Sequence, residues 1–392
     1  MKYDFDEEIP RTGTGCSKWD NVGVRIGNEK ALPMWVADTD FRCPQPVVDA
    51  ICQRAMHPIY GYPFIDASFY SATKHWLEKR HHWEVMTEWM VFTTGVVPAI
   101  YLMVQTFTNP GDEVIIQQPV YYPFADAIRD NGRVLLNNQL KYSEGHYSID
   151  FDDLENLASR PTAKLLVICN PHNPVGRVWT REELCRLSEI CLRNHVIVVS
   201  DEIHSDLLLF GSSHIPVASL DAKYAMNTVA CYSPSKTFNI AGLRASCIVI
   251  PNPQIRERFS AQLRRNRCAQ QNVFALPAYV AAYEGCEDYL EQLISYLEGN
   301  AIYLKTYLER NMPKLVLSQL EATYLGWIDC RALNMDNDQI ADFFVQKCEV
   351  AISRGDFFGE AGGGFVRINL GCTRKTLRMA LERIQKQYDL LA

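Results

Sequence analysis

The sequence lacks the features that mark several classes of protein. No apolar run approaches the ~18 residues of a membrane-spanning helix. There is no basic block either: 39 Lys and Arg against 46 Asp and Glu give a net charge of −7, spread along the chain. Neither nucleic acid nor a membrane is therefore expected as a partner. Residues 1–8 are acidic where a signal peptide has an apolar core, which predicts a cytoplasmic protein.

The thirteen cysteines lack the patterns that would give them a chemical role. Their number is odd, they are scattered, and no Cys-x-x-Cys pair occurs. The nine histidines show no HExxH spacing. Neither a disulfide framework nor a metal site is expected, and the cysteines are predicted to be small buried apolar residues.

What the chain does have is the alternation of an α/β protein. Its 392 residues suffice for two or three domains. Between about residues 90 and 250, helical patterns alternate with continuous apolar runs, which are typical of strands covered on both faces of a mostly parallel sheet. Thr180 and Glu183 predict a capping box at the start of a helix over 180–194. The runs are 114–116, 133–136, 165–169, 196–199, 228–231 and 246–250.

After residue 252 the pattern changes to long helices and fewer strands, which predicts a smaller α+β domain. No Gly/Ser- or Pro-rich linker separates independent bodies. We predict an N-terminal arm over 1–45 that also forms part of the small domain, a large domain over 46–285 and a small domain over 286–392. The elements expected after residue 252 are helices at 253–265, 276–311, 337–347 and 373–391, and strands at 324–330 and 364–370.

Several polar residues stand just beyond predicted strands, where an α/β sheet usually places its ligand site. Asn173 follows one apolar run, Asp201 ends the next, and Lys236 follows a third. Gly95 precedes a helical pattern. Each has an ordinary structural explanation alone, since a lysine after a strand is usually solvated and Asn-Pro sequences form turns. Their combination favours a shared site.

The combination meets the requirements of pyridoxal 5′-phosphate (PLP). The aldehyde needs a lysine for a Schiff base, which Lys236 in Ser-Pro-Ser-Lys-Thr would supply. The ring nitrogen must stay protonated to draw electrons, and the carboxylate of Asp201 would keep it so. The phenolic oxygen needs a neutral donor such as the Asn173 amide. Tyr121 would supply an aromatic partner for the ring.

The phosphate of PLP needs N–H donors and positive charge. Residues 93–98, Thr-Thr-Gly-Val-Val-Pro, predict a helix N-terminus led by Gly95, with the proline in the first turn. Ser233, Ser235 and Arg244 would complete the phosphate cup.

These residues, in this order and spacing, resemble the fold-type I PLP enzymes of the aspartate aminotransferase superfamily over essentially the whole chain. The resemblance implies the α/β PLP-dependent transferase-like fold. It also implies Lys236, Tyr121 and Asp201 as catalytic residues. The cofactor-binding residues would be Gly95, Val96, Val97, Tyr121, Asn173, Asp201, His204, Ser233, Ser235, Lys236 and Arg244.

The resemblance also assigns residues outside the cofactor site. Tyr62, in Tyr-Gly-Tyr, is similar to a tyrosine that reaches the phosphate of the neighbouring subunit, which implies a homodimer. Arg367 resembles the arginine that binds the α-carboxylate of an amino-acid substrate, where a guanidinium suits a bidentate pair. Val36, Ala37 and Tyr122 are expected to line the substrate end of the site.

Two N-terminal segments narrow the resemblance to one branch of the superfamily. Residues 5–20, with Phe-Asp, Arg-Thr-Gly-Thr and Lys-Trp-Asp, are similar to MalY/PatB-type C–S β-lyases, and so are residues 32–41, Leu-Pro-Met-Trp-Val-Ala-Asp-Thr-Asp-Phe. His204 stands where the aspartate aminotransferases have a tyrosine near the ring hydroxyl. The resemblance therefore implies a lyase of the cystathionine β-lyase type.

The implied reaction is α,β-elimination from an L-cysteine S-conjugate such as cystathionine. Lys236 would remove the Cα proton, the β-thiolate would leave, and the products would be a thiol, pyruvate and ammonia. The thiol from cystathionine is homocysteine. Burial and the positively charged ring are expected to lower the pKa of Lys236, so that its amine is neutral when it acts.

Two other functions stay open. The same residues support transamination, because the sequence indicates an electron sink but not which bond breaks. PLP folds also serve as ligand-sensing parts of transcription regulators. Here the motifs begin within the first 40 residues, the last predicted helix ends the chain, and the net charge is acidic, so we expect no DNA-binding domain.

Overall fold

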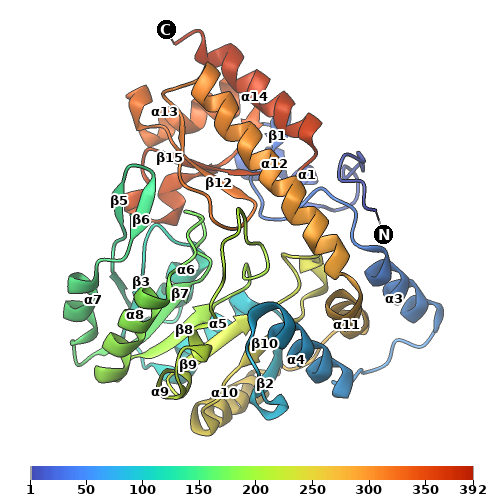
Figure 1. The fold of residues 1–392 in the computed structure, drawn as a ribbon, viewed down its shortest axis with the longest axis vertical. Coiled ribbons are helices and arrows are strands. Elements are labelled where there is room, and N and C mark those ends of the chain that lie inside the picture. The colour runs from blue at the N-terminus through green and yellow to red at the C-terminus, as the bar shows by residue number, and fades with distance from the viewer. Residues whose placement is uncertain (1, 392) are drawn as a thin grey trace.

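The computed structural model describes residues 2–391, and its largest element is a seven-stranded sheet (Figure 1). The strand order is β2-β10-β9-β8-β7-β3-β4. Strands β9, β8, β7, β3 and β4 are parallel, whereas β10 is antiparallel to both of its neighbours. The bounds are β2 (Met90–Thr93), β3 (Glu113–Ile116), β4 (Val134–Asn137), β7 (Ala163–Cys169), β8 (Ile197–Asp201), β9 (Thr228–Tyr232) and β10 (Ser246–Val249).

The expected mostly parallel α/β sheet is confirmed, and each of the six apolar runs carries a strand. Strand β2, Met-Val-Phe-Thr, was not among the predicted runs. The continuous apolar run does not reveal that β10 is antiparallel to its neighbours, because a strand of either direction would be buried on both faces at this place in the sheet.

Helices cover both faces of this sheet, as the continuous apolar runs require. Val114 and Ile116 pack with α5, α6 and α10, whereas Ile115 between them packs with α7 and α8. The capping box of α8 is present, since Thr180 and Glu183 each accept from the other's backbone N–H. The helices are α3 (Gln45–Met56), α4 (Ala67–His81), α5 (Val96–Phe107), α6 (Pro123–Asp130), α7 (Phe151–Ala158), α8 (Arg181–Arg193), α9 (Ala222–Ala225), α10 (Pro253–Asn266) and α11 (Ala275–Gly285).

The C-terminal part holds a four-stranded antiparallel sheet in the order β11-β12-β15-β14. The helix predicted over 276–311 is two helices, because the chain leaves helical geometry at Cys286, just after Gly285 packs against Pro46. The helix predicted over 337–347 ends in a π-helical turn. The bounds are α12 (Glu287–Asn311), β11 (Val316–Leu317), β12 (Leu325–Asp329), α13 (Asn337–Asp342), β13 (Val350–Ala351), β14 (Ser353–Arg354), β15 (Phe365–Asn369) and α14 (Arg374–Tyr388).

The N-terminal arm joins the C-terminal part rather than the large sheet (Figure 1). Its strand β1 (Leu32–Pro33) pairs in parallel with β13, and Phe5 packs on Phe41 and Tyr289. The arm also carries α1 (Ser17–Asp20) and α2 (Val22–Ile26), and a hairpin of β5 (Lys141–Ser143) and β6 (His146–Ser148) leaves the large sheet. Within residues 2–391, no helix has the length and apolar content needed to cross a bilayer.

Candidate active site

The predicted cofactor residues meet in one cavity at the carboxyl edge of the large sheet. Asp201 is the last residue of β8, while Asn173 and Lys236 follow β7 and β9. Parallel strands end at the same edge of a sheet, which brings these residues together. The cavity has a volume of about 360 Å³. Its walls include Gly95, Val96, Val97, Tyr121, Asn173, Asp201, His204, Ser233, Ser235, Lys236 and Arg244.

Lys236 presents a free amine to this cavity. Its Nζ donates to the backbone oxygen of Ala37, at 2.7 Å. Burial lowers the pKa of Lys236 from 10.5 to about 8, because a charged ammonium loses hydration inside the protein. At pH 7 about a tenth of this lysine is therefore neutral and available as a nucleophile or base, far more than for a lysine in water.

Asp201 is a buried carboxyl group that forms no ion pair with any of residues 2–391. Its Oδ1 accepts from the backbone N–H of Ile203, at 3.2 Å. Burial raises the pKa of Asp201 to about 7, because the carboxylate is poorly solvated. A protonated ring nitrogen would supply the missing positive charge at this point.

The neighbouring donors are neutral groups. Asn173 Oδ1 accepts from Arg367 Nη1, at 2.9 Å, so its amide NH₂ remains to donate into the cavity. Burial, together with the positive charges of Lys236 and Arg367, lowers the pKa of His204 to about 3, so its ring is neutral. His204 Nδ1 is buried without a hydrogen-bond partner in the described structure. Such an atom calls for a ligand or water.

The far end of the cavity suits a phosphate. Gly95 precedes α5 with φ +137°, a conformation that favours glycine, and the first N–H groups of the helix are free to bind an anion. Arg244 is exposed at the cavity wall. Ser233 Oγ donates to Ala245 O, at 2.7 Å, and accepts from Ser235 N, so its hydroxyl braces the turn before Lys236.

These groups fit PLP. An amine, an unpaired buried carboxyl group and a helix N-terminus with an arginine stand in one cavity, and each matches one functional group of the cofactor. Tyr121 lines the same cavity, and burial raises the pKa of its phenol, so it presents a neutral ring. No group of three His, Cys, Asp or Glu between residues 2 and 391 is arranged to hold a metal ion.

A second cavity, of about 490 Å³, adjoins the first and shares Ala37, Tyr121 and Lys236 with it. Val36, Tyr122 and Arg367 line it, as the sequence predicts for a substrate site. This cavity is more apolar than the first, since Trp35, Ile352, Phe357 and Phe358 also contribute.

Arg367 is a buried cation without a carboxylate partner in the described structure. Its Nη2 donates to Trp35 O and Ser353 Oγ, at 3.0 and 3.2 Å, and its guanidinium lies 4.8 Å from the centre of the Phe358 ring. Burial lowers the pKa of Arg367 to about 10, and its Nε is buried without a hydrogen-bond partner. A substrate carboxylate would supply both the missing charge and the missing acceptor.

One predicted site residue stands apart. Tyr62 is 98% exposed and does not line either cavity of its own chain. Sequence reasoning missed a further set: Ser353 and Phe358 beside Arg367, and Tyr324 beside Ala37. These residues come from strands and loops far along the chain, and no motif links them to the site.

The comparisons with known proteins agree with this site. The model of the family "Aminotransferase class I and II" matches residues 36–384. The chain is 44% identical to cystathionine beta-lyase PatB of Bacillus subtilis over 97% of this chain and 98% of the relative, and 32% identical to protein MalY of Escherichia coli over 96% of each. The structure of cystalysin from Treponema denticola, which contains a pyridoxal 5′-phosphate cofactor, superposes with a TM-score of 0.96 at 37% identity and full coverage of both chains. The chain therefore belongs to the class I and II aminotransferase family, in the group that includes PatB and MalY.

Proposed function

We propose that this protein is a PLP-dependent carbon–sulfur β-lyase that cleaves L-cystathionine and other L-cysteine S-conjugates. With cystathionine and one water, the products are homocysteine, pyruvate and ammonia. The observation that carries the proposal is the placement of the Lys236 amine in the wall shared by the two cavities. One cavity fits PLP, and the other offers Arg367 to an amino-acid carboxylate.

When bound, PLP supplies an electron sink for the negative charge that develops at the substrate Cα. Lys236, whose pKa is about 8, takes the Cα proton and holds it at Nζ, where the protonated amine donates a hydrogen bond to the Ala37 carbonyl. Arg367 orients the substrate through its carboxylate. Asp201 keeps a ring nitrogen protonated, and His204 stays neutral beside it.

The substrate cavity supports a conjugate with a long and polar distal end. Its apolar middle suits a thioether chain, while Arg25 and Asp126 also line it. Neither of these side chains has an ion-pair or hydrogen-bond partner among the contacts of the described residues. The second amino-acid group of cystathionine carries one charge of each sign, which these two residues complement. We therefore rank cystathionine above S-alkylcysteines as a substrate.

We also propose that the enzyme acts as a homodimer. From the last residue of α3 to the start of α4 the chain exposes a run of large apolar side chains, which is unusual at a surface: Met56, Ile59, Tyr60, Tyr62 and Phe64. Arg244 is also exposed at the phosphate end of the cavity. Tyr62 of a second copy would cover this end and add a donor. The expected loss of PLP affinity in Tyr62→Phe, together with the molecular mass in solution, tests this arrangement.

The cytoplasmic location predicted from the sequence stays a proposal. None of the thirteen cysteines forms a disulfide, and free thiols persist in a reducing compartment. A redox measurement of these thiols in freshly lysed cells would test it.

The decisive experiment incubates the purified, PLP-loaded protein with cystathionine and measures pyruvate and free thiol without any added keto acid. Equal amounts of both products are expected. Strict dependence on 2-oxoglutarate, with no thiol formed, would instead identify an aminotransferase. The ratio of kcat/KM for cystathionine to that for S-methylcysteine should fall in Arg25→Gln and Asp126→Asn, while activity on S-methylcysteine is retained.

A further inference from the structure

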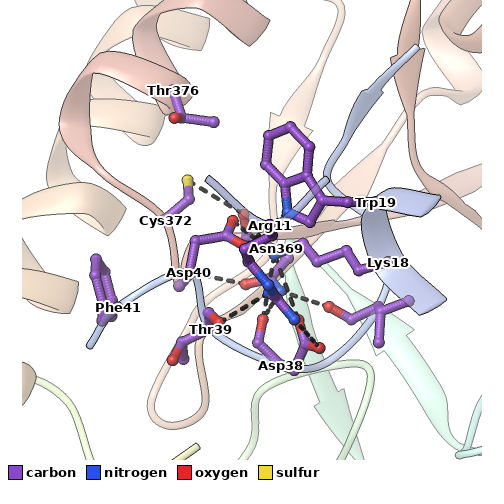
Figure 2. A network of polar contacts seen from close by, with 12 residues as sticks. Arg11, Lys18, Trp19, Asp38, Thr39, Asp40, Phe41, Asn369, Cys372 and Thr376 are labelled. Carbon is purple, nitrogen blue, oxygen red and sulfur yellow. Dashed lines mark hydrogen bonds and ion pairs between the residues drawn. The ribbon is translucent and has the colours of Figure 1, made fainter. Parts of the chain in front are cut away.

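The N-terminal segments that narrowed the resemblance meet in one cluster of charges, which we name the arm cluster: Arg11, Lys18, Trp19, Asp38 and Asp40 (Figure 2). Arg11 forms two hydrogen bonds to the Asp38 carboxylate, at 3.0 and 2.8 Å, and one to Asp40, at 2.7 Å. Lys18 donates to Asp40 at 2.8 Å, and Trp19 Nε1 donates to the same carboxylate at 3.0 Å. The lysine side chain is fully buried, so two cations and two anions balance at a shielded position.

The arm cluster is attached to the loop that touches the catalytic lysine. The Ala37 carbonyl, directly before Asp38, accepts from Lys236 Nζ at 2.7 Å and from Tyr324 OH at 3.1 Å. The next carbonyls are held by the arm cluster itself, since Lys18 donates to Asp38 O and Arg11 to Thr39 O. The peptide that meets the lysine is thus fixed from its C-terminal side by the arm.

The small domain holds the same loop from the other side. Asn369 Nδ2 donates to both Val36 O and Asp38 O, and Arg367 Nη2 donates to Trp35 O. Figure 2 shows Asn369 beside Asp38 and Arg11. The arm, the large domain and the small domain therefore meet at the Ala37 peptide.

Stability alone explains this cluster poorly. Taking a lysine ammonium out of water costs several kcal/mol, and apolar residues of similar volume usually stabilise a fold at least as well as a buried ion pair. The arm already has an apolar anchor in Phe5, which is buried against Phe41 and Tyr289. Because these charges lie next to a residue that transfers a proton, they can also act on the position and the protonation of that residue.

We propose that Arg11 and Lys18 are positioning residues for Lys236: by binding Asp38 and Asp40 they hold the Ala37 carbonyl on Lys236 Nζ and balance the charge of Asp38, the residue next to Ala37. The inference rests on the proposed function, in which Lys236 is the base. It gives the N-terminal segments a role in proton transfer.

The charges around Lys236 support this assignment. Burial lowers the pKa of Lys236, the negative charge of Asp38 raises it, the positive charge of Arg367 lowers it, and the negative charge of Asp201 raises it. His204 and Tyr324 also face this region. Asp38 thus has the largest effect of these charges on the pKa of the lysine, and Arg11 and Lys18 both pair with its carboxylate.

The test compares the Asp38→Asn and Arg11→Gln variants of the full-length holoenzyme. Two readouts are used: the pH titration of the visible absorption of the resting holoenzyme, which reports protonation at Lys236 Nζ, and the acid limb of the kcat–pH profile. Asp38→Asn removes a negative charge and should move both to lower pH. Arg11→Gln removes the balancing cation and should move both to higher pH. Shifts of about 0.5–1 pH unit are expected.

A matched control is Arg42→Gln, which removes an exposed ion pair of the same arm, with Glu7, that does not face Lys236. It should shift neither readout. The proposal would be overturned by pH shifts of the same sign in both variants, or by the absence of any pH shift in variants that fold. Either result would show that the cluster only stabilises the fold. If Asp38→Asn does not fold, Arg11→Lys decides: it should restore the wild-type pH dependence that Arg11→Gln loses. Failure of the proposed function is separate, because the wild-type protein would then release no thiol.

Discussion

The two cavities of the active site are built in different ways. The cofactor cavity is formed mainly by residues that follow strands of one sheet, so a single topology places Asn173, Asp201 and Lys236 together. The substrate cavity joins three parts of the chain: the loop after β1, the part that holds the seven-stranded sheet and the C-terminal part that carries Arg367. Cofactor binding therefore depends on one rigid sheet, whereas substrate binding depends on how separate parts pack. Substitutions in the cofactor cavity should therefore affect PLP binding, whereas substitutions in the substrate cavity should affect substrate binding.

The largest effect should come from the residue that both cavities share. Lys236→Ala removes the amine that binds the cofactor and takes the Cα proton, so turnover of cystathionine should fall by at least about 10²–10⁴-fold. Pyruvate release measures it, and the visible absorption of the bound cofactor should change as well. The exposed Lys305→Ala on α12 is the control and should behave as wild type. Unchanged turnover in Lys236→Ala would remove the lysine from its assigned role.

On the cofactor side, the buried carboxyl group makes a pH-dependent prediction. Burial raises the pKa of Asp201 to about 7, so the folded, cofactor-free chain is penalised when this group ionises. The penalty is absent below about pH 4, where the group is protonated in the folded and unfolded states alike. It grows as the pH rises and is complete above pH 7, reaching at most about 4 kcal/mol.

Because PLP would pair this charge, the increase in Tm on adding PLP should be larger at pH 8 than at pH 5. Thermal unfolding of the two forms across that range measures it. In Asp201→Asn the increase in Tm on adding PLP should depend less on pH, since the amide does not ionise. An equal increase in Tm at both pH values in the wild type would show that Asp201 carries no unpaired charge in the cofactor-free protein.

On the substrate side, Arg367→Lys should separate charge from geometry. Lysine keeps the positive charge but cannot form the bidentate pair of hydrogen bonds that a guanidinium makes with a carboxylate. This loss costs about 1.5–3 kcal/mol, or roughly 10–100-fold in kcat/KM. The loss should appear chiefly in KM, with a smaller change in PLP affinity, because Arg367 lines the substrate cavity and contacts the cofactor cavity through Asn173. Arg331→Lys, at a surface pair with Asp329, is the control. A loss of PLP affinity equal to that of substrate would contradict the division into two sides.

The same contrast explains how much the sequence could predict. Lys236, Asp201 and Asn173 each follow an apolar run, so parallel topology alone brings them together. Arg367 was found only through resemblance to a family, and its partners Ser353 and Phe358 were not found at all. The Ala37 carbonyl contributes a backbone atom, which leaves no mark in a side-chain pattern. The break between α11 and α12 was also missed, because apolar spacing continues across it.

The smallest effect should come from the point where the two sides meet. Tyr324 OH donates to the Ala37 carbonyl, and Tyr324→Phe removes this one hydrogen bond, worth about 0.5–1.5 kcal/mol. With the carbonyl held less firmly, kcat should fall about 2–10-fold with KM nearly unchanged, as steady-state kinetics would show. Tyr307→Phe loses a comparable hydrogen bond, to Gln385, away from the site, and should alter only stability. If both variants lower kcat equally, the Tyr324 hydroxyl has no special place in catalysis, and the Ala37 peptide is held well enough by the arm and Asn369.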